Sequence, residues 1–285
     1  MRRVCAVMSV MSLSTSSGLA VSGERLFSKM VVEEAFSAKL TFVFSLRPLV
    51  EDHMILAPKR RVSRLSELTA EEAEELFASI PRLQASLRER DVAISAFNVA
   101  MKDGAAAGQL PSDHAHVHVL PRRRGDLQRN DDIYDLLENW RPDDEKSEPT
   151  PFEVPDDSDR RPRTADDMAS EAADYRDTHF KMEGPVNFGK FDLDPRQVFF
   201  ATKLTMAIVN LKPLVPGHVL VVPRRVVQHL RDLTEDEALD LWQSLRHVHQ
   251  LILDKNQKTS ANIAVQDGKD AGQSVPHVHV HLLPR

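Results

Sequence analysis

The chain has 285 residues, a formal net charge of −6, 41% hydrophobic residues and a single cysteine. This length suits one large or two ordinary domains, and the hydrophobic content is enough for real cores. The acidic balance argues against a general nucleic-acid binder, which would be basic, and no apolar run is long enough for a membrane span. One cysteine excludes an internal disulfide framework and fits a reducing compartment, so we expect a cytoplasmic protein.

The first thirty residues differ from the rest of the chain. Arg2 and Arg3 are followed by small, apolar and serine residues, and no acidic residue comes before Glu24. This composition resembles a targeting segment, so an organelle address stays open as an alternative. We expect residues 1–30 to be a disordered extension that precedes the first domain.

A tandem duplication follows. Short motifs recur at an offset that drifts only from 165 to 163 residues, which single-residue insertions in loops explain. The recurring positions include the pairs His53 and His218, Asn98 and Asn262, Asp103 and Asp267, Gly104 and Gly268, Gln109 and Gln273, and His118 and His281. We therefore expect one domain at residues 31–140 (copy 1) and a second at residues 188–285 (copy 2).

Each copy has the same predicted elements. Three apolar, β-prone segments in each predict strands near 39–46, 53–58 and 94–101, and near 203–211, 218–223 and 261–266. A helix should follow each of the capping boxes that begin at Thr69 and Thr234. The fold class is therefore α+β, with each copy a mostly antiparallel sheet that carries a long helix on one face.

The helix of copy 2 has an apolar stripe at the spacing of a helix buried against a sheet, and Trp242 belongs to it. We therefore expect Trp242 to be a core residue rather than a platform for base stacking. His247 and His249 come late in the same helix, where surface or helix-end charge roles suffice to explain them.

A linker separates the two copies. Residues 141–187 begin with a stretch that is rich in proline and in charged residues, which indicates a connecting segment without a core of its own. A short helix should follow within it, from about Ala165 to Arg176, with Thr164 as its cap.

Two runs place three histidines at alternate positions, with apolar residues between them. They are His114, His116 and His118 in copy 1, and His277, His279 and His281 in copy 2. On an extended strand such side chains share one face. Histidine can be neutral and nucleophilic near pH 7. Six imidazoles packed only as core would need six sets of hydrogen-bond partners, so the pattern predicts a site.

Metal binding is the plainer interpretation of such histidines, and geometry argues against it. Positions i and i+4 on a strand lie roughly 13 Å apart, at about 3.3 Å per residue. A histidine reaches zinc over roughly 5–6 Å from its Cβ, including a bond of about 2 Å. Two histidines at positions i and i+4 are therefore too far apart to bind the same ion. The one cysteine, Cys5, is remote, and no HExxH run occurs. We expect no metal site.

At these residues the sequence resembles the histidine triad superfamily, most closely its fragile-histidine-triad branch of diadenosine triphosphate hydrolases. The likeness runs from about Phe188 to Arg285 in copy 2 and begins at about Lys39 in copy 1. It implies a hydrolase that cleaves dinucleoside polyphosphates at the α-phosphate through a covalent nucleotidyl-histidine and releases AMP. It also implies no required cofactor, with Mg²⁺ at most accompanying the polyphosphate.

The resemblance assigns roles to individual residues. His279 would be the nucleophile, His277 and His281 would hydrogen-bond the phosphate region, and His116 would be the nucleophile of copy 1. The residues implied to bind nucleotide and phosphates are Asn210, His218, Gln266, Gly272, Gln273, Ser274 and Val275 in copy 2, with Gln109 and His118 in copy 1.

Both copies depart from the family pattern. In copy 1, Ser45 stands where copy 2 has an asparagine, and Lys102 stands where it has a glutamine. Glu51 and Asp52 replace a Pro–Gly pair, and we expect these acids to repel a polyphosphate, with Lys102 partly offsetting them. Copy 2 ends at Arg285 without the usual C-terminal tail, so either the tail of copy 1 serves both sites or the given chain is incomplete.

Family members typically pair two units side by side and join their sheets. Two copies in one chain therefore predict an intrachain pseudo-dimer, with a homodimer as the alternative. Other functions stay open at this point. They are a nucleoside phosphoramidase or nucleotidyltransferase of the same superfamily, and a nucleotide-binding regulatory module without turnover. Transferases usually carry glutamine at the last triad position, so His118 and His281 favour hydrolysis.

Overall fold

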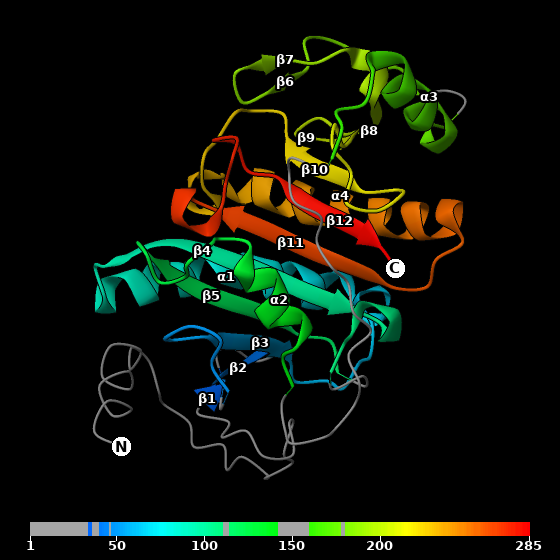
Figure 1. Ribbon diagram of the computed structural model, residues 1–285. Helices are drawn as coiled ribbons and strands as arrows, with labels where there is room; N and C mark the ends of the chain where they lie inside the picture. Colours follow the sequence, from blue (N-terminus) through cyan, green and yellow to red (C-terminus); the bar gives the residue numbers. More distant parts are fainter. Residues whose placement is uncertain (1–33, 36–39, 46, 111–113, 142–159, 178–179) are drawn as a thin grey trace.

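The structure, a computed structural model, describes residues 34–35, 40–45, 47–110, 114–141, 160–177 and 180–285. One ten-stranded sheet runs through both copies, and all its strand pairs are antiparallel (Figure 1). The extension expected at residues 1–30 lies outside the described residues, and so does the part of the linker at 142–159.

The sheet order follows the duplication. Copy 1 supplies, from the edge inward, β1 (Glu34–Ala35), β2 (Leu40–Phe44), β3 (Met54–Pro58), β5 (Val117–Arg123) and β4 (Ile94–Asp103). Copy 2 continues with β11 (Ala261–Asp267), β12 (Val280–Pro284), β10 (Val219–Pro223), β9 (Thr205–Val209) and β8 (Val198–Ala201). A short ribbon of β6 (Asn187–Phe188) and β7 (Phe191–Asp192) stands apart. The predicted α+β fold with two similar units is confirmed.

The two copies meet at the middle of the sheet. Strand β4 of copy 1 pairs with β11 of copy 2 over its C-terminal part, from Asp103 opposite Ala261 to Phe97 opposite Asp267. This ladder makes the sheets of the two copies continuous within one chain, as the repeat predicted.

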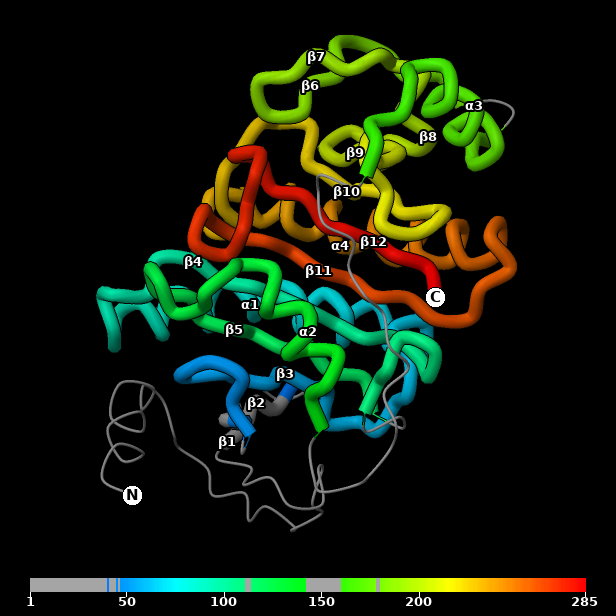
Figure 2. The backbone as a smooth tube through the Cα atoms, viewed as in Figure 1, coloured from blue at the N-terminus to red at the C-terminus, as the bar shows by residue number. Residues whose placement is uncertain are grey.

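Two long helices cover one face of this sheet. Helices α1 (Ala70–Arg90) and α4 (Glu235–Asn256) lie side by side on that face (Figure 2). Both predicted capping boxes are present, because the Thr69 and Thr234 side chains accept from the amides three residues on and the glutamates there bond back.

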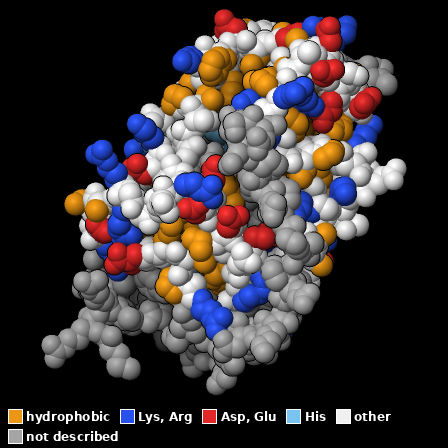
Figure 3. All heavy atoms as spheres, in the orientation of Figure 1, with side chains coloured by type: hydrophobic (Ala, Val, Ile, Leu, Met, Phe, Trp, Pro, Cys, Tyr) orange, Lys and Arg blue, Asp and Glu red, His pale blue; other side chains and the backbone are white. Residues whose placement is uncertain are grey.

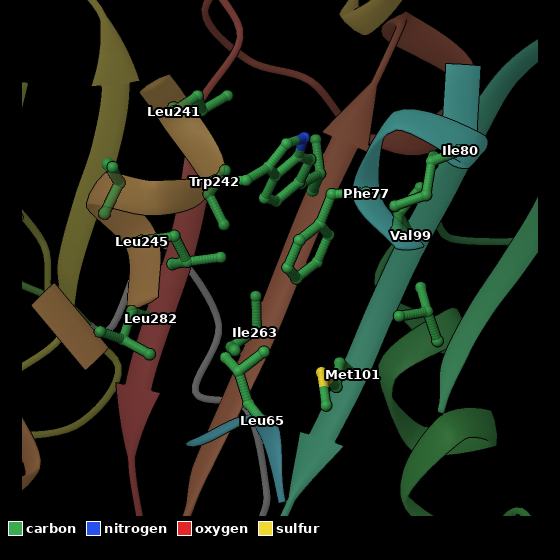
Figure 4. Packing of buried hydrophobic residues seen from close by; sticks show 14 of the residues in the cluster. Leu65, Phe77, Ile80, Val99, Met101, Leu241, Trp242, Leu245, Ile263 and Leu282 are labelled. Carbon is green, nitrogen blue, oxygen red and sulfur yellow. The ribbon is translucent and has the colours of Figure 1, made fainter. Parts of the chain in front are cut away.

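The core of the molecule crosses the boundary between the copies. Phe77 of α1 stacks on Trp242 of α4 with ring centroids 4.1 Å apart and an interplanar angle of 10° (Figure 4). Trp242 is 4% exposed, so the prediction that it is a core residue is confirmed. Such burial stabilises the fold by roughly 1.5–3 kcal/mol for a large apolar side chain.

His249 is not the surface residue that its position late in the helix suggested. It is 2% exposed, and its Nε2 lies 3.0 Å from Oδ2 of Asp103, at the end of β4 in the other copy. Periodicity along α4 places His249 on the buried side, and the buried carboxylate there requires a polar partner. His247, by contrast, is exposed.

Repeated asparagines connect the copies beside the central ladder. Asn98 Nδ2 donates to the carbonyl oxygen of Ala271 at 3.0 Å. With its amide oriented to satisfy both neighbours, Asn262 donates to the carbonyl oxygen of Ala107 at 3.2 Å. Each asparagine thus holds the loop before the histidine run of the opposite copy, which explains why the sequence repeats this residue.

Two smaller helices complete the described fold. Helix α3 (Ala165–Tyr175) has the predicted Thr164 cap and packs on β8, β9 and α4, so it belongs to the body of copy 2. Helix α2 (Asp132–Glu138), from the tail of copy 1, lies on the sheet face opposite α1 and α4. Acidic and basic side chains are interspersed on the surface of that side (Figure 3).

Gly268 marks a close approach between the copies that a side chain would disrupt. Its φ is +108°, and a Cβ there would lie 2.9 Å from the Cβ of Ala96. Gly268→Ala should therefore lower the free energy of unfolding by roughly 2–5 kcal/mol, through backbone strain and overpacking. Urea unfolding followed by circular dichroism measures this loss.

Gly125→Ala is the matched control, because Gly125 also has a positive φ of +76° but a Cβ there would meet nothing within 4 Å. Its cost should stay at about 1–2 kcal/mol, the penalty of the left-handed backbone alone. Equal losses in the two variants would contradict a tight contact between the copies at Gly268.

Candidate active site

A cavity of about 450 Å³ opens on the sheet face that carries α2. Ligand pockets commonly have this size. Its walls come from both copies. Copy 2 supplies Phe188, Asn210, His218, Leu220, Gln266, Gly272, Ser274, Val275, His279 and His281, and copy 1 supplies Ala100, Lys102, Asp131, Tyr134, Leu137 and Glu138.

His279 presents one bare ring nitrogen to this cavity. Its Nδ1 lies 2.6 Å from the carbonyl oxygen of His277, and a carbonyl can only accept, so Nδ1 carries the proton. The lone pair of Nε2 is therefore free in the neutral ring. Burial lowers the pKa of His279 below 6.5, so this neutral form persists at neutral pH. The arrangement suits a nucleophile.

His281 presents a proton beside that lone pair. The Leu214 amide donates to His218 Nδ1 at 3.1 Å, which leaves the proton of His218 on Nε2. That Nε2 lies 3.0 Å from His281 Nδ1 and 3.2 Å from Asn210 Nδ2. Because Nδ1 of His218 already accepts from the Leu214 amide, we assign the His218 proton to the shorter contact, so that His281 accepts at Nδ1 and carries its own proton on Nε2. His281 Nε2 is buried and has no hydrogen-bond partner among the described residues. A substrate oxygen would satisfy it.

Burial keeps the two supporting histidines neutral as well. It lowers the pKa of His218 to about 3, with the charge of Arg160 as the next cause. It lowers the pKa of His277 to about 4. An uncharged network holds each ring in one tautomer, which fixes the direction of every hydrogen bond in it.

His277 does not reach the cavity, which corrects the expectation that three imidazoles share one face. Strand β12 begins only at Val280, and the chain bends at His277. The His277 ring accepts from the Gly189 amide at 3.0 Å through Nδ1 and donates to the carbonyl oxygen of Pro223 at 3.0 Å through Nε2. Its side chain therefore supports the site, while its carbonyl orients His279.

Most of the binding residues implied for copy 2 gather at the cavity, and Gln273 does not. Its amide donates to the carbonyl oxygen of Gln228 at 2.9 Å, so it closes the loop before the histidines. Gln109 has a similar structural position in copy 1. It donates to the carbonyl oxygen of Ser63 at 2.8 Å and accepts from the Gly104 amide at 2.6 Å.

The triad of copy 1 has the same internal hydrogen bonds but is covered by Trp140. His116 Nδ1 lies 2.9 Å from the carbonyl oxygen of His114, and His53 Nε2 lies 3.0 Å from His118 Nδ1. The Trp140 ring lies with its centroid 4.7 Å from that of His118 and 6.0 Å from that of His116. His116 is 1% exposed, and neither His116 nor His118 is among the residues that line the cavity.

Trp140 is itself fixed in this position. It is 3% exposed, and its Nε1 donates to the carbonyl oxygen of Arg47 at 3.0 Å. Sequence reasoning missed Trp140. One of only two tryptophans, placed at the end of the copy 1 tail, was the one available indication of a buried anchor.

The acidic pair of copy 1 does not act as expected either. Arg123 binds Asp52 at 2.8 Å and approaches Glu51 at 3.9 Å, so both carboxylates are compensated, and neither lines the cavity. Lys102, although it belongs to copy 1, does line the cavity that contains the copy 2 residues His279 and His281. Burial lowers the pKa of Lys102 to about 8, and Nζ donates to the carbonyl oxygen of Glu138 at 3.3 Å.

Two features are absent from the described residues. No cluster of three or more His, Cys, Asp or Glu side chains within them is arranged to hold a metal ion. None of their helices combines the length and the apolar character that crossing a membrane requires.

The HIT domain model matches residues 35–125 and 193–285, so the chain belongs to the HIT domain family and contains the domain twice. It is similar over 98 residues, at 52% identity, to the bifunctional bis(5'-adenosyl)-triphosphatase/adenylylsulfatase FHIT of Arabidopsis thaliana, with 34% of this chain and 54% of that protein covered. Over 104 residues it is 55% identical to the asymmetrical bis(5'-nucleosyl)-tetraphosphatase of Schizosaccharomyces pombe, with 36% and 57% covered. The chain thus spans about half the length of the curated relatives it matches.

A likeness of fold extends over both copies. The X-ray structure of a GalT-like protein from Arabidopsis thaliana covers 87% of this chain and 74% of its own, with a TM-score of 0.54 and 14% identity. Together with the family match, this supports one fold built from two HIT units.

Removing the Trp140 ring should leave an empty space beside His116 and His118 of copy 1. We expect Trp140→Ala to lower the free energy of unfolding by about 3–5 kcal/mol, since a large buried side chain leaves a cavity. Trp140→Phe, which keeps an aromatic ring, should cost clearly less. Chemical unfolding of both variants measures the difference, and an unchanged stability of Trp140→Ala would show that the ring does not fill this site.

Proposed function

We propose that this protein hydrolyses dinucleoside polyphosphates of the diadenosine triphosphate type, cleaving at the α-phosphate and releasing AMP. The observation that carries the proposal is the bare Nε2 of His279 beside the unpartnered Nε2–H of His281 in a cavity of nucleotide size. The names of the similar proteins from Arabidopsis and fission yeast support the substrate class.

In the first step, the His279 Nε2 lone pair attacks the α-phosphorus, and the bond from that phosphorus to the bridging oxygen breaks. With diadenosine triphosphate, ADP leaves and AMP stays covalently bound to His279. The Nδ1–H bond to the His277 carbonyl stabilises the positive charge that develops on the ring. The His281 proton and the Gln266 amide face the non-bridging oxygens, where negative charge is greatest.

In the second step, water attacks the same phosphorus and the phosphorus–nitrogen bond breaks. AMP and a proton are released, and His279 returns to its neutral form. Splitting the displacement in two gives retention at phosphorus and two moderate barriers instead of one large one. Mg²⁺ would enter with the polyphosphate as part of the substrate.

The two copies have different roles in this proposal. Copy 2 carries the reaction, and the triad of copy 1, which lies under Trp140, does not turn over. His116 therefore has the internal geometry of a nucleophile without access to a substrate.

Asparagine substitutions at the two central histidines test this assignment. His279→Asn should lower release of AMP from diadenosine triphosphate by at least about a thousandfold, because the nucleophile is lost. His116→Asn should stay within about twofold of the wild type, because that ring meets no substrate.

Chromatography of the nucleotide products, with adenosine phosphoramidate as a second substrate, gives the result. Full activity of His279→Asn would move the chemistry to copy 1 or out of the triads. Binding of diadenosine triphosphate without any AMP release by the wild type would replace the hydrolase by a nucleotide-binding module.

The dependence on pH follows from the lowered pKa of His279. Protonation removes the nucleophilic lone pair, so kcat/KM should fall as the pH falls, with a midpoint below pH 6.5. Stability also declines in this range, because the unfolded chain takes up protons at its histidines before the folded chain does. Circular dichroism at each pH separates the two effects, and a midpoint above 6.5 in folded protein would contradict a buried neutral nucleophile.

A further inference from the structure

One residue of copy 1 lines the cavity and contacts Gln266, which lies beside the nucleophile His279 of copy 2. Tyr134, on α2, accepts a hydrogen bond from Gln266 Nε2 at 2.7 Å. Gln266 and His279 are neighbours across β11 and the start of β12, because Val265 pairs with Val280. Tyr134 therefore lies next to the place where the attacked phosphate must be.

The Tyr134–Gln266 pair keeps at least one hydrogen-bond donor for a ligand. A tyrosine hydroxyl has one proton and an amide nitrogen has two, and the described residues offer the pair no further acceptor. If the amide donates, the hydroxyl proton is left over, and with the amide turned the other way the N–H₂ group is left over. In both orientations a donor remains beside the cavity.

Tyr134 also stays protonated. Burial raises its pKa, and the nearby charge of Asp131 acts in the same direction. The hydroxyl is thus a neutral donor at any working pH, so it attracts phosphate oxygens and never repels them as a phenolate would.

The helix that carries Tyr134 is held in place by copy 1. Ile133 and Leu137 of α2 pack on Ala100 and Leu120, and Trp140, three positions after Leu137, packs against His118 of copy 1. Trp140 comes only six positions after Tyr134, so the same short segment that covers one histidine site forms a wall of the other. A fixed wall can position a ligand group, because its own ordering cost is already met by the fold.

The opposite wall belongs to copy 2 and includes Phe188, Asn210 and Leu220. A dinucleotide has a nucleoside at each end and its phosphates in the middle. With the attacked phosphate at His279 between the two walls, a dinucleotide that reaches both walls places one nucleoside against each copy.

We propose that Tyr134 of copy 1 is a substrate-positioning residue for the reaction at His279, holding the phosphate chain on the side of the leaving nucleotide. The proposal rests on the proposed function. It makes the active site a product of both copies, with copy 1 acting on substrate choice instead of catalysis.

Tyr134→Phe tests the proposal, and the chain supplies its own control. It has two tyrosines, and Tyr175 bonds Glu171 at 3.0 Å on α3, away from the cavity. Wild type, Tyr134→Phe and Tyr175→Phe are compared for kcat and KM with diadenosine triphosphate, diadenosine tetraphosphate and adenosine phosphoramidate. The last substrate has no second nucleotide.

Tyr134→Phe should raise KM for both dinucleotides about tenfold, the loss expected when one buried hydrogen bond is removed. Its KM for adenosine phosphoramidate should change less than about twofold, and Tyr175→Phe should match the wild type throughout. An unchanged KM for the dinucleotides overturns the proposal. Equal losses on all three substrates also overturn it, because Tyr134 would then only support Gln266.

Failure of the proposed function is a separate result. If the wild type releases no AMP from any substrate, calorimetric titration with a methylene-bridged diadenosine triphosphate analogue replaces the kinetics. Tyr134→Phe should then bind this analogue about tenfold more weakly than Tyr175→Phe does. Equal affinities would overturn the role of Tyr134 whatever the reaction is.

Discussion

The backbone ladder between β4 and β11 is the interaction on which the arrangement of this molecule depends. Each copy alone would expose that strand as an open edge, and exposed edges invite association with other chains. Pairing within one chain satisfies both edges at once. It also brings the loop before each histidine run within hydrogen-bond distance of an asparagine of the other copy. The ladder therefore helps to position the histidine runs as well as the two sheets.

The two triads show that the same local structure can have opposite consequences. In both copies a carbonyl oxygen takes the Nδ1 proton of the middle histidine, at 2.9 Å in copy 1 and 2.6 Å in copy 2. What differs is the occupant of the space in front of the ring, which is Trp140 in one copy and a cavity in the other. In a symmetric dimer a change to one site is a change to both. In a tandem repeat each site changes alone, which permits one copy to become a wall of the other.

The sequence predicted what depends on local pattern. Spacing placed the capping boxes of Thr69 and Thr234, periodicity placed Trp242 in the core, and the recurrence of Asn98 as Asn262 revealed the duplication. It failed where the outcome depends on the path of an irregular segment. Nothing in the tail of copy 1 says that Trp140 turns back over its own histidines, since that path is set by packing of Ile133 and Leu137 on the sheet. The buried position of His249 follows from the periodicity of α4, whereas its partner Asp103 belongs to the other copy and could not be assigned from local pattern.

If the proposed function holds, the charges around the cavity favour neutral donors as the main ligands of the phosphates. Lys102, Arg160 and Lys212 line it, and so do the acidic side chains of Asp131 and Glu138. Burial already lowers the pKa of Lys102 to about 8, so part of its charge is lost at slightly alkaline pH. A polyphosphate held mainly by cations would then bind less well as the pH rises. His281, Tyr134 and Gln266 lose no charge in that range, and their directions are fixed by partners within the fold. Such oriented dipoles need no rearrangement when negative charge builds up on the phosphate oxygens, which is the condition for selective stabilisation of the transition state.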